Sequence, residues 1–172
     1  MTRSCLGATN RQDDGRGPIL IGMAVTLSSI QDFIGRDHGL AVVSVVRPDQ
    51  TPASSLVNAG LVGHPETGES CVGFVVRGSA AKVRHLRGAP FVSVVWRDGW
   101  RWVGAAGPCE LIGPDDARDG VDADGVRLLL RAVFEGAGGT HDDWTAYDRV
   151  MADECRLAIV MRPVRLYGNP DV

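Results

Sequence analysis

The chain has 172 residues, which suits one domain with a buried core, and its 44% apolar content is typical of a globular protein rather than a disordered or collagen-like one. Its net charge of −3 argues against nucleic acid as a partner, because proteins that bind nucleic acid present a basic face. No apolar run is long enough to cross a bilayer, so we expect no membrane partner either.

The cysteines and histidines show no disulfide or metal-ligand pattern. The cysteines are far apart and form no C-x-x-C pair, and the histidines lack close neighbours of the metal-binding kind. We therefore expect no metal site, and reduced thiols in a cytoplasmic protein. The cysteines are Cys5, Cys71, Cys109 and Cys155, and the histidines are His38, His64, His85 and His141.

The first 22 residues show no hydrophobic period, unlike the rest of the chain. We interpret residues 1–22 as a mobile N-terminal extension and residues 23–172 as one folded domain. Residues 28–35 then predict a short helix with a serine cap and with Ile30, Phe33 and Ile34 on one face.

Three predicted strands follow this helix. Residues 39–46 are β-branched and apolar on both faces, which is typical of a buried strand. Residues 53–62 form a second strand, whose small polar residues are unusual for a strand that only packs, and residues 71–76 form a third. Turn residues at 47–52 and 64–69 separate them, so we expect two hairpins.

The third strand ends before Gly78, and a basic helix is predicted to begin near Lys82. Residues 90–96 and 100–112 are the next two strands, joined by an Asp-Gly turn. Gly104 and Gly107 inside the fifth strand indicate a sheet that curves and closes.

The last third of the chain adds two helices and further strands. The first helix runs from an Asp122 cap to Gly136. The second opens at Thr140, and its buried stripe is Trp144, Tyr147, Val150 and Met151. Strands are expected at 156–161 and 164–168. We therefore predict a mainly β protein with α-helices (α+β), in which a small antiparallel barrel has helices over its ends.

Lys82 is the only lysine among eighteen basic residues, and it lies where a strand gives way to a helix. A helix start offers unpaired N–H groups and the positive end of the helix dipole, so a lysine there can complete a phosphate site. A solvated surface lysine is the alternative interpretation, and the residues alone leave both open.

Between residues 23 and 170 the chain contains, in this order, the short segments GLAVVS (39–44), TPASSLVN (51–58), AKVRHLR (81–87) with Pro90, GWRWV (99–103), Gly107, GTHDDWTAY (139–147) and LYGNP (166–170). Their order and spacing resemble the pyridoxamine 5′-phosphate oxidase-like superfamily, and within it the actinobacterial F420-dependent reductases. The resemblance implies a six- to seven-stranded split β-barrel of the FMN-binding type, and a homodimer with a cofactor groove at the interface.

The resemblance also implies the site. In the family, main-chain groups of the strand matching 52–58 bond the pyrimidine edge of the cofactor ring. That assigns Ser54, Ser55, Val57 and Asn58 to the ring, with hydroxyls satisfied inside the sheet or by water as the alternative. The phosphate lysine of the family falls on Lys82.

Two groups of residues accompany this assignment. Relatives often have a basic or hydrogen-bonding residue just before the lysine, where this chain has alanines at 80 and 81, so Arg77 and Ser79 would assist the phosphate. Trp100 and Trp102 would face one side of the fifth strand, as barrel core, as dimer interface or, as the resemblance implies, as the wall of the partner's groove. The candidates for binding an acidic cofactor tail are Arg84, Arg87 and Arg101.

The resemblance implies an enzyme in which reduced F420 gives a hydride to an electron-poor C=C, C=O or C=N bond of a small organic substrate. No motif requires a protein nucleophile or base, so no catalytic residue is assigned, and water or Tyr167 would supply the proton. An FMN-dependent oxidoreductase is the first alternative, because FMN would use the same strand and lysine. A non-catalytic flavin- or haem-binding module and a structural dimer are the others.

Overall fold

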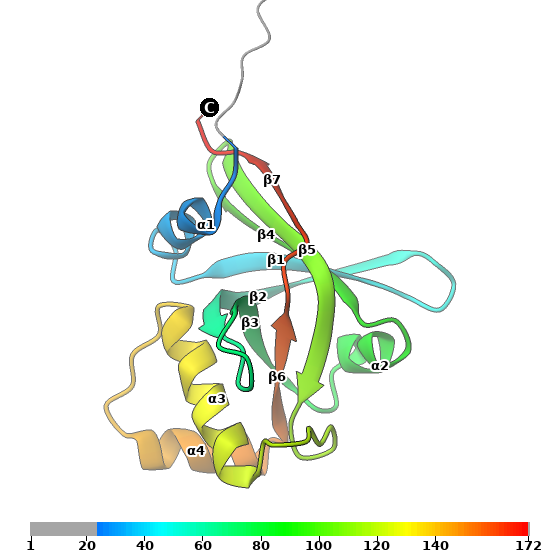
Figure 1. Ribbon diagram of the computed structural model, residues 1–172, viewed down its shortest axis with the longest axis vertical. Helices are drawn as coiled ribbons and strands as arrows, with labels where there is room; N and C mark the ends of the chain where they lie inside the picture. The colour runs from blue at the N-terminus through cyan, green and yellow to red at the C-terminus, as the bar shows by residue number, and fades with distance from the viewer. Residues whose placement is uncertain (1–23, 172) are drawn as a thin grey trace, which may run out of the picture.

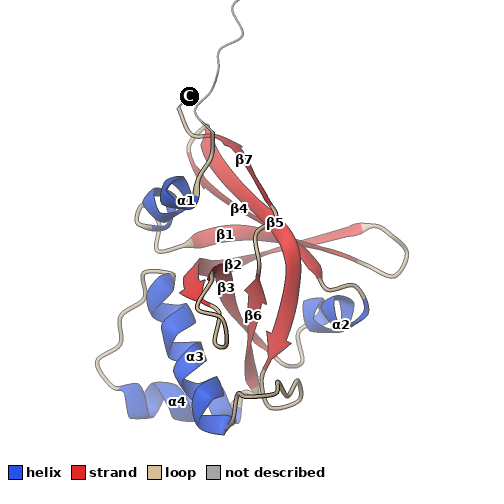
Figure 2. Ribbon diagram, in the orientation of Figure 1, coloured by secondary structure: helices blue, strands red, loops and turns tan. Residues whose placement is uncertain are grey.

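The computed structural model describes residues 24–171, so the extension predicted at residues 1–22 lies outside the described part of the chain. Figures 1 and 2 show how strands and helices are arranged in that part. The strands are β1 (Leu40–Val46), β2 (Pro52–Gly63), β3 (Ser70–Arg77), β4 (Phe91–Asp98), β5 (Arg101–Ile112), β6 (Arg156–Met161) and β7 (Arg165–Asn169). The helices are α1 (Leu27–Ile34), α2 (Ala81–Gly88), α3 (Ala123–Gly136) and α4 (Trp144–Asp153).

The strands form the predicted antiparallel barrel. Their order around it is β4-β1-β2-β3-β6-β5, the β4–β5 pair closes the ring, and β7 adds to β5 as an extra strand. The predicted α+β fold class and split-barrel architecture are confirmed.

The barrel is split because its two long strands change partner halfway. β2 pairs with β1 over residues 52–58 and with β3 over residues 59–63. β5 pairs with β4 up to Pro108 and with β6 from Cys109 onward. The ring is therefore two half-sheets that share β2 and β5, and they diverge where the partners change.

The interior of the barrel holds the largest buried side chains, with Trp96 and Phe74 at the centre. Trp96 also donates from Nε1 to the Ala59 carbonyl at 3.0 Å. α1 and α2 each insert apolar side chains into this core, as their periodicity predicts. α3 covers a second, smaller core on the outer side of β3 and β6 (Figure 1).

Two predicted helix starts differ from the structure. The cap of α1 is Thr26 rather than a serine, since its hydroxyl accepts the Ser29 N–H and the Ser29 hydroxyl accepts the Thr26 N–H. α4 begins at Trp144 rather than at Thr140, because the Asp143 carboxylate supplies the cap.

The predicted buried stripe of α4 is only partly correct. Tyr147 is buried, and Trp144 and Met151 are half-buried. Val150 is 45% exposed, because α4 packs on α3 and β6 through a narrow face only.

Candidate functional site

The first half of β2 has an open edge. Residues 52–58 have β1 on one side, and no strand of the described chain pairs with them on the other. In antiparallel pairs the main-chain groups of successive residues point to opposite sides, and the Ala59 N–H bonds the Gly39 carbonyl, on the β1 side. The main-chain groups of Ser54, Leu56 and Asn58 therefore point to the open edge. This edge can bond the polar rim of a planar ligand.

The predicted ring residues divide between the two faces of β2. Ser54 and Asn58 are exposed on the outer face, while Ser55 and Val57 point inward and are partly buried. The Ser54 Oγ lies 2.8 Å from the Ser44 Oγ, and the Asn58 Nδ2 donates to the His38 carbonyl at 2.8 Å. The side chains of Ser54 and Asn58 thus already have hydrogen-bond partners within the protein. The groups of this strand that are free to bond a ligand are therefore main-chain N–H and C=O groups.

Lys82 lies in the first turn of α2, which begins just after β3 has diverged from β2. Its side chain is partly buried and forms no ion pair with any residue of the described chain. Burial lowers the pKa of Lys82, because a buried ammonium group loses hydration without gaining a counter-charge. An anion bound beside Lys82 would supply that counter-charge.

Arg77 and Ser79, the predicted helpers of Lys82, lie at the end of β3 and in the β3–α2 connection, respectively. The guanidinium of Arg77 makes a two-point pair with Glu154, at 3.2 Å and 2.6 Å. Ser79 is exposed. The helix cap, Ala80, makes no side-chain hydrogen bond, so the N–H groups of α2 are not capped by its own side chain.

The two tryptophans of the β4–β5 hairpin have different surroundings. Trp100 belongs to the turn and not to β5, because the hairpin closes from Asp98 to Arg101, and Trp100 is 88% exposed. Trp102 is partly buried, with its ring edge-to-face against Tyr167 at 5.8 Å. The prediction that Trp100 is part of the fifth strand is therefore wrong, and only Trp102 is a strand residue.

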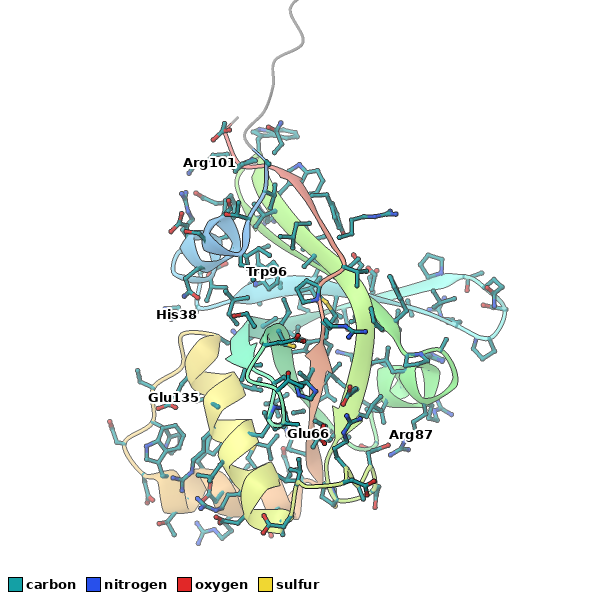
Figure 3. All side chains as sticks on the ribbon, in the orientation of Figure 1. His38, Glu66, Arg87, Trp96, Arg101 and Glu135 are labelled. Carbon is teal, nitrogen blue, oxygen red and sulfur yellow. The ribbon has the colours of Figure 1, made fainter. Side chains whose placement is uncertain are left out.

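The arginines predicted to bind an acidic tail do not form one cluster. Arg87 makes a two-point pair with Asp116, at 2.9 Å and 2.7 Å, and Arg101 pairs with Asp98. Arg101 lies near the top of Figure 3 and Arg87 at the lower right, so the two are well separated. Arg84 is exposed on α2, two residues after Lys82. Unlike Arg87 and Arg101, it forms no ion pair within residues 24–171.

A cavity of about 570 Å³ lies in the split. Asn58 of β2 and Val75 of β3 flank it just past the last β2–β3 pair, and the end of α3, α4 and the start of β6 complete it. Its lining residues are His38, Asn58, Val75, Val133, Phe134, Ala137, Gly138, Gly139, Thr140, Tyr147, Met151 and Arg156. Of the predicted site residues, only Asn58 is among them. No site role was predicted for the other lining residues. Gly139, Thr140 and Tyr147 belong to the segment 139–147 that carries the resemblance, and most of the rest come from β3, α3, α4 and β6, whose spacing along the chain does not indicate a common pocket.

The outer face of β2, β1 and β4 is apolar and exposed. The register places Leu56, Val42 and Val95 in one row across these strands, and Val46 beside Phe91 two rows away. The serines Ser54, Ser44 and Ser93 form the row between. Leu56 is 65% exposed and Phe91 is 49% exposed, so a broad apolar sheet face is uncovered in the single chain.

Cys71, Cys109 and Cys155 form no disulfide with one another, and Cys5 lies outside the described residues. Burial raises the pKa of Cys109 to about 12, so it stays a thiol at neutral pH.

Between residues 24 and 171, no three His, Cys, Asp or Glu side chains gather as a metal-binding group. In the same range, none of the helices has the length and apolar character needed to cross a membrane.

No protein-family model matches the chain. Solved structures with a similar fold include a conserved hypothetical protein of Mycobacterium tuberculosis, with a TM-score of 0.65 and 16% identity over 87% of this chain and 88% of that one. A pyridoxamine 5′-phosphate oxidase-related, FMN-binding protein of Nostoc punctiforme has a TM-score of 0.55 and 14% identity over 81% of both chains. A heme-binding protein of Mycobacterium smegmatis has a TM-score of 0.55 and 17% identity over 84% of this chain and 54% of that one. The chain thus has the split-barrel fold that the resemblance implies.

Proposed function

We propose that this chain is an oxidoreductase that binds a phosphate-bearing flavin-type cofactor, F420 or alternatively FMN, along the open edge of β2. One observation carries the proposal: an unpaired strand edge and a partly buried lysine without a counter-charge flank the same divergence of β2 from β3. The open main-chain groups of Ser54, Leu56 and Asn58 fit the hydrogen-bonding rim of a flavin-type ring, and Lys82 with the N–H groups of α2 fits its phosphate.

When bound in its reduced form, either cofactor would supply a hydride to an electron-poor double bond of a small organic substrate and would itself be oxidised. The main-chain groups of Ser54, Leu56 and Asn58 would hold the ring edge, and Lys82 with the N–H groups of α2 would hold the phosphate. Tyr167 is the proposed alternative to water as a proton source, and its hydroxyl lies 2.5 Å from the Ser93 Oγ. The FMN-binding neighbour from Nostoc supports a flavin on this barrel, and the heme-binding neighbour makes haem the competing ligand.

Three parallel titrations of the purified full chain test the proposal. F420 and FMN are followed by their own fluorescence, and haemin by its absorbance. We expect saturable binding of F420 or FMN at one site per chain, with haemin bound weakly or not at all. Tight binding of haemin alone, or of none of the three, would refute the oxidoreductase proposal.

The pKa of Lys82 predicts how cofactor affinity depends on pH. Only the charged ammonium pairs with phosphate, so affinity is complete below the pKa of Lys82 and falls as the pH rises through it. Because burial lowers that pKa from 10.5, the fall should begin at a lower pH than an ordinary lysine would give. In Lys82→Arg the guanidinium stays charged, and the fall should disappear. An identical pH profile in both proteins would show that another group causes it.

We also propose a homodimer, formed by the apolar outer face of β1, β2 and β4 against a second copy. Leu56 is the most exposed apolar side chain of this face, so Leu56→Glu would bury an unpaired carboxylate in the dimer and should raise the dimer dissociation constant at least about thirtyfold, since such changes cost about 2 kcal/mol or more. Sedimentation velocity measures the effect. Leu128→Glu is the control, because Leu128 is 50% exposed on α3, away from this face. A monomeric wild type, or equal effects of both variants, would contradict the interface.

A further inference from the structure

The cavity in the split has the composition of a binding pocket rather than of a packing defect. Val75, Val133 and Met151 make apolar walls from three different elements, and Asn58 and Arg156 add polar groups. A cavity of about 570 Å³ with mainly apolar walls and a few polar groups is typical of sites for small organic ligands.

One wall of the cavity is aromatic and fixed. Phe134 and Tyr147, which line it, have ring centroids 5.1 Å apart, and Trp144 packs edge-on against both, at 6.2 Å and 5.4 Å. The Tyr147 hydroxyl donates to the Leu130 carbonyl at 3.1 Å. That hydroxyl is therefore engaged within the helix pair, and the wall offers ring surface to a ligand. A flat, mainly apolar molecule fits such a wall.

The charge at the cavity is positive. Arg156 bonds Glu154 from Nε at 2.7 Å and from Nη2 at 2.6 Å, and the same carboxylate also pairs with Arg77. Two guanidinium groups thus share one carboxylate, which leaves one net positive charge. None of the residues that line the cavity in the described chain is acidic.

The Arg156 charge also acts on the aromatic wall. Burial raises the pKa of Tyr147 to about 12, and Arg156 is the charged group that opposes this rise most. The guanidinium therefore acts on the side of the cavity that Tyr147 lines.

We infer that this cavity binds the substrate, a flat and mainly apolar organic anion, and that Arg156 selects its anionic group. The inference rests on the proposed oxidoreductase function and names a substrate class for it. The ring of such a molecule lies against Phe134 and Tyr147, and its anionic group lies at Arg156.

A pair of fluorescent probes separates the charge from the ring system. 8-Anilinonaphthalene-1-sulfonate is an aromatic, mainly apolar anion, and N-phenyl-1-naphthylamine has the same rings without the sulfonate. Both gain fluorescence in an apolar pocket, so their dissociation constants can be measured on the full chain and its variants. The wild type should bind the anion more tightly than the neutral probe.

Three variants give different expected results. Arg156→Gln should weaken the anion by about tenfold or more and change the neutral probe little, because one charge-assisted bond is lost. Glu154→Gln should strengthen the anion, because it removes the carboxylate that neutralises Arg156. Val75→Phe should weaken both probes by filling the cavity. The matched control is Arg149→Gln, an arginine on α4 that does not line this cavity and should leave both probes unchanged.

Equal weakening of the anion by Arg156→Gln and Arg149→Gln would overturn the inference, since that would be a general charge effect. Weakening by both Arg156→Gln and Glu154→Gln would also overturn it, because the ion pair would then act structurally. If Val75→Phe left the dissociation constants of both probes unchanged, the probes would bind outside this cavity, which would also overturn the inference. Cofactor titrations on the same variants separate the two proposals: intact F420 or FMN binding with a failed probe test contradicts only the substrate class.

Discussion

Replacing Lys82 with alanine is expected to weaken cofactor binding by about tenfold to a hundredfold, since one charge-assisted hydrogen bond to a phosphate contributes about 1.5–3 kcal/mol. The loss should be at the upper end of this range, because Lys82 is partly buried and Arg77, the charged one of its two predicted helpers, is paired with Glu154. Fluorescence titration of F420 and FMN measures the effect.

Arg84→Ala is the matched control for Lys82→Ala. It removes a positive charge from the same helix, but Arg84 is exposed, so the affinity should change by a small factor only. The stability of the cofactor-free protein should not fall in Lys82→Ala. Folding lowers the pKa of Lys82, so the charged lysine disfavours the folded state below that pKa, and alanine removes this cost. Equal affinity of wild type and Lys82→Ala would contradict the phosphate assignment.

Replacing Gly60 with alanine is expected to lower the free energy of unfolding by about 3 kcal/mol or more, the upper range for overpacking. A Cβ on Gly60 would overlap the Gly136 carbonyl and the Ala137 nitrogen at the end of α3, and a Cβ on Gly136 would overlap the Leu61 carbonyl. The clash is with backbone, which no side-chain rotation relieves. β2 and α3 would have to separate.

Urea denaturation of both proteins measures this loss. Gly88→Ala is the control, because a Cβ at the end of α2 meets no atom within 4 Å and alanine favours the helix by up to about 1 kcal/mol. Since Ala137 also lines the cavity in the split, Gly60→Ala should change probe binding there as well. A Gly60→Ala protein as stable as wild type would show that β2 and α3 are less closely packed than described.

Much of the fold was predictable, because strand alternation and turn residues are local signals. The strand at 156–161 and the Asp122 cap of α3 are at the predicted residues. The position at which β2 leaves β1 for β3 was not predictable, since hydrophobic alternation determines which face a residue takes but not which strand pairs with it. Trp100 was placed in a strand because alternation with Trp102 continues into the tight turn at Gly99.

Candidate site residues could be predicted only where the residues next to them in the sequence indicate their role. Lys82 follows from its position at a helix start. The pairing of Arg77 with Glu154 joins residues 77 positions apart, and such a pair has no signature in the spacing of either residue. The place of Arg156 in the cavity was equally unpredictable, because β6 carries Arg156 while the aromatic wall comes from α3 and α4. Lys82 therefore stays a predicted phosphate ligand, whereas the cavity could not be predicted from the sequence.

We propose that the divergence of β2 from β3 holds a phosphate-bearing flavin-type cofactor. A crystal structure of the full chain grown with F420 or FMN would test this proposal. We expect the ring rim on the main-chain groups of Ser54, Leu56 and Asn58, with a phosphate oxygen within hydrogen-bond distance of the Lys82 Nζ. A cofactor bound away from this edge, or a phosphate that contacts other cations while Lys82 faces solvent, would contradict it.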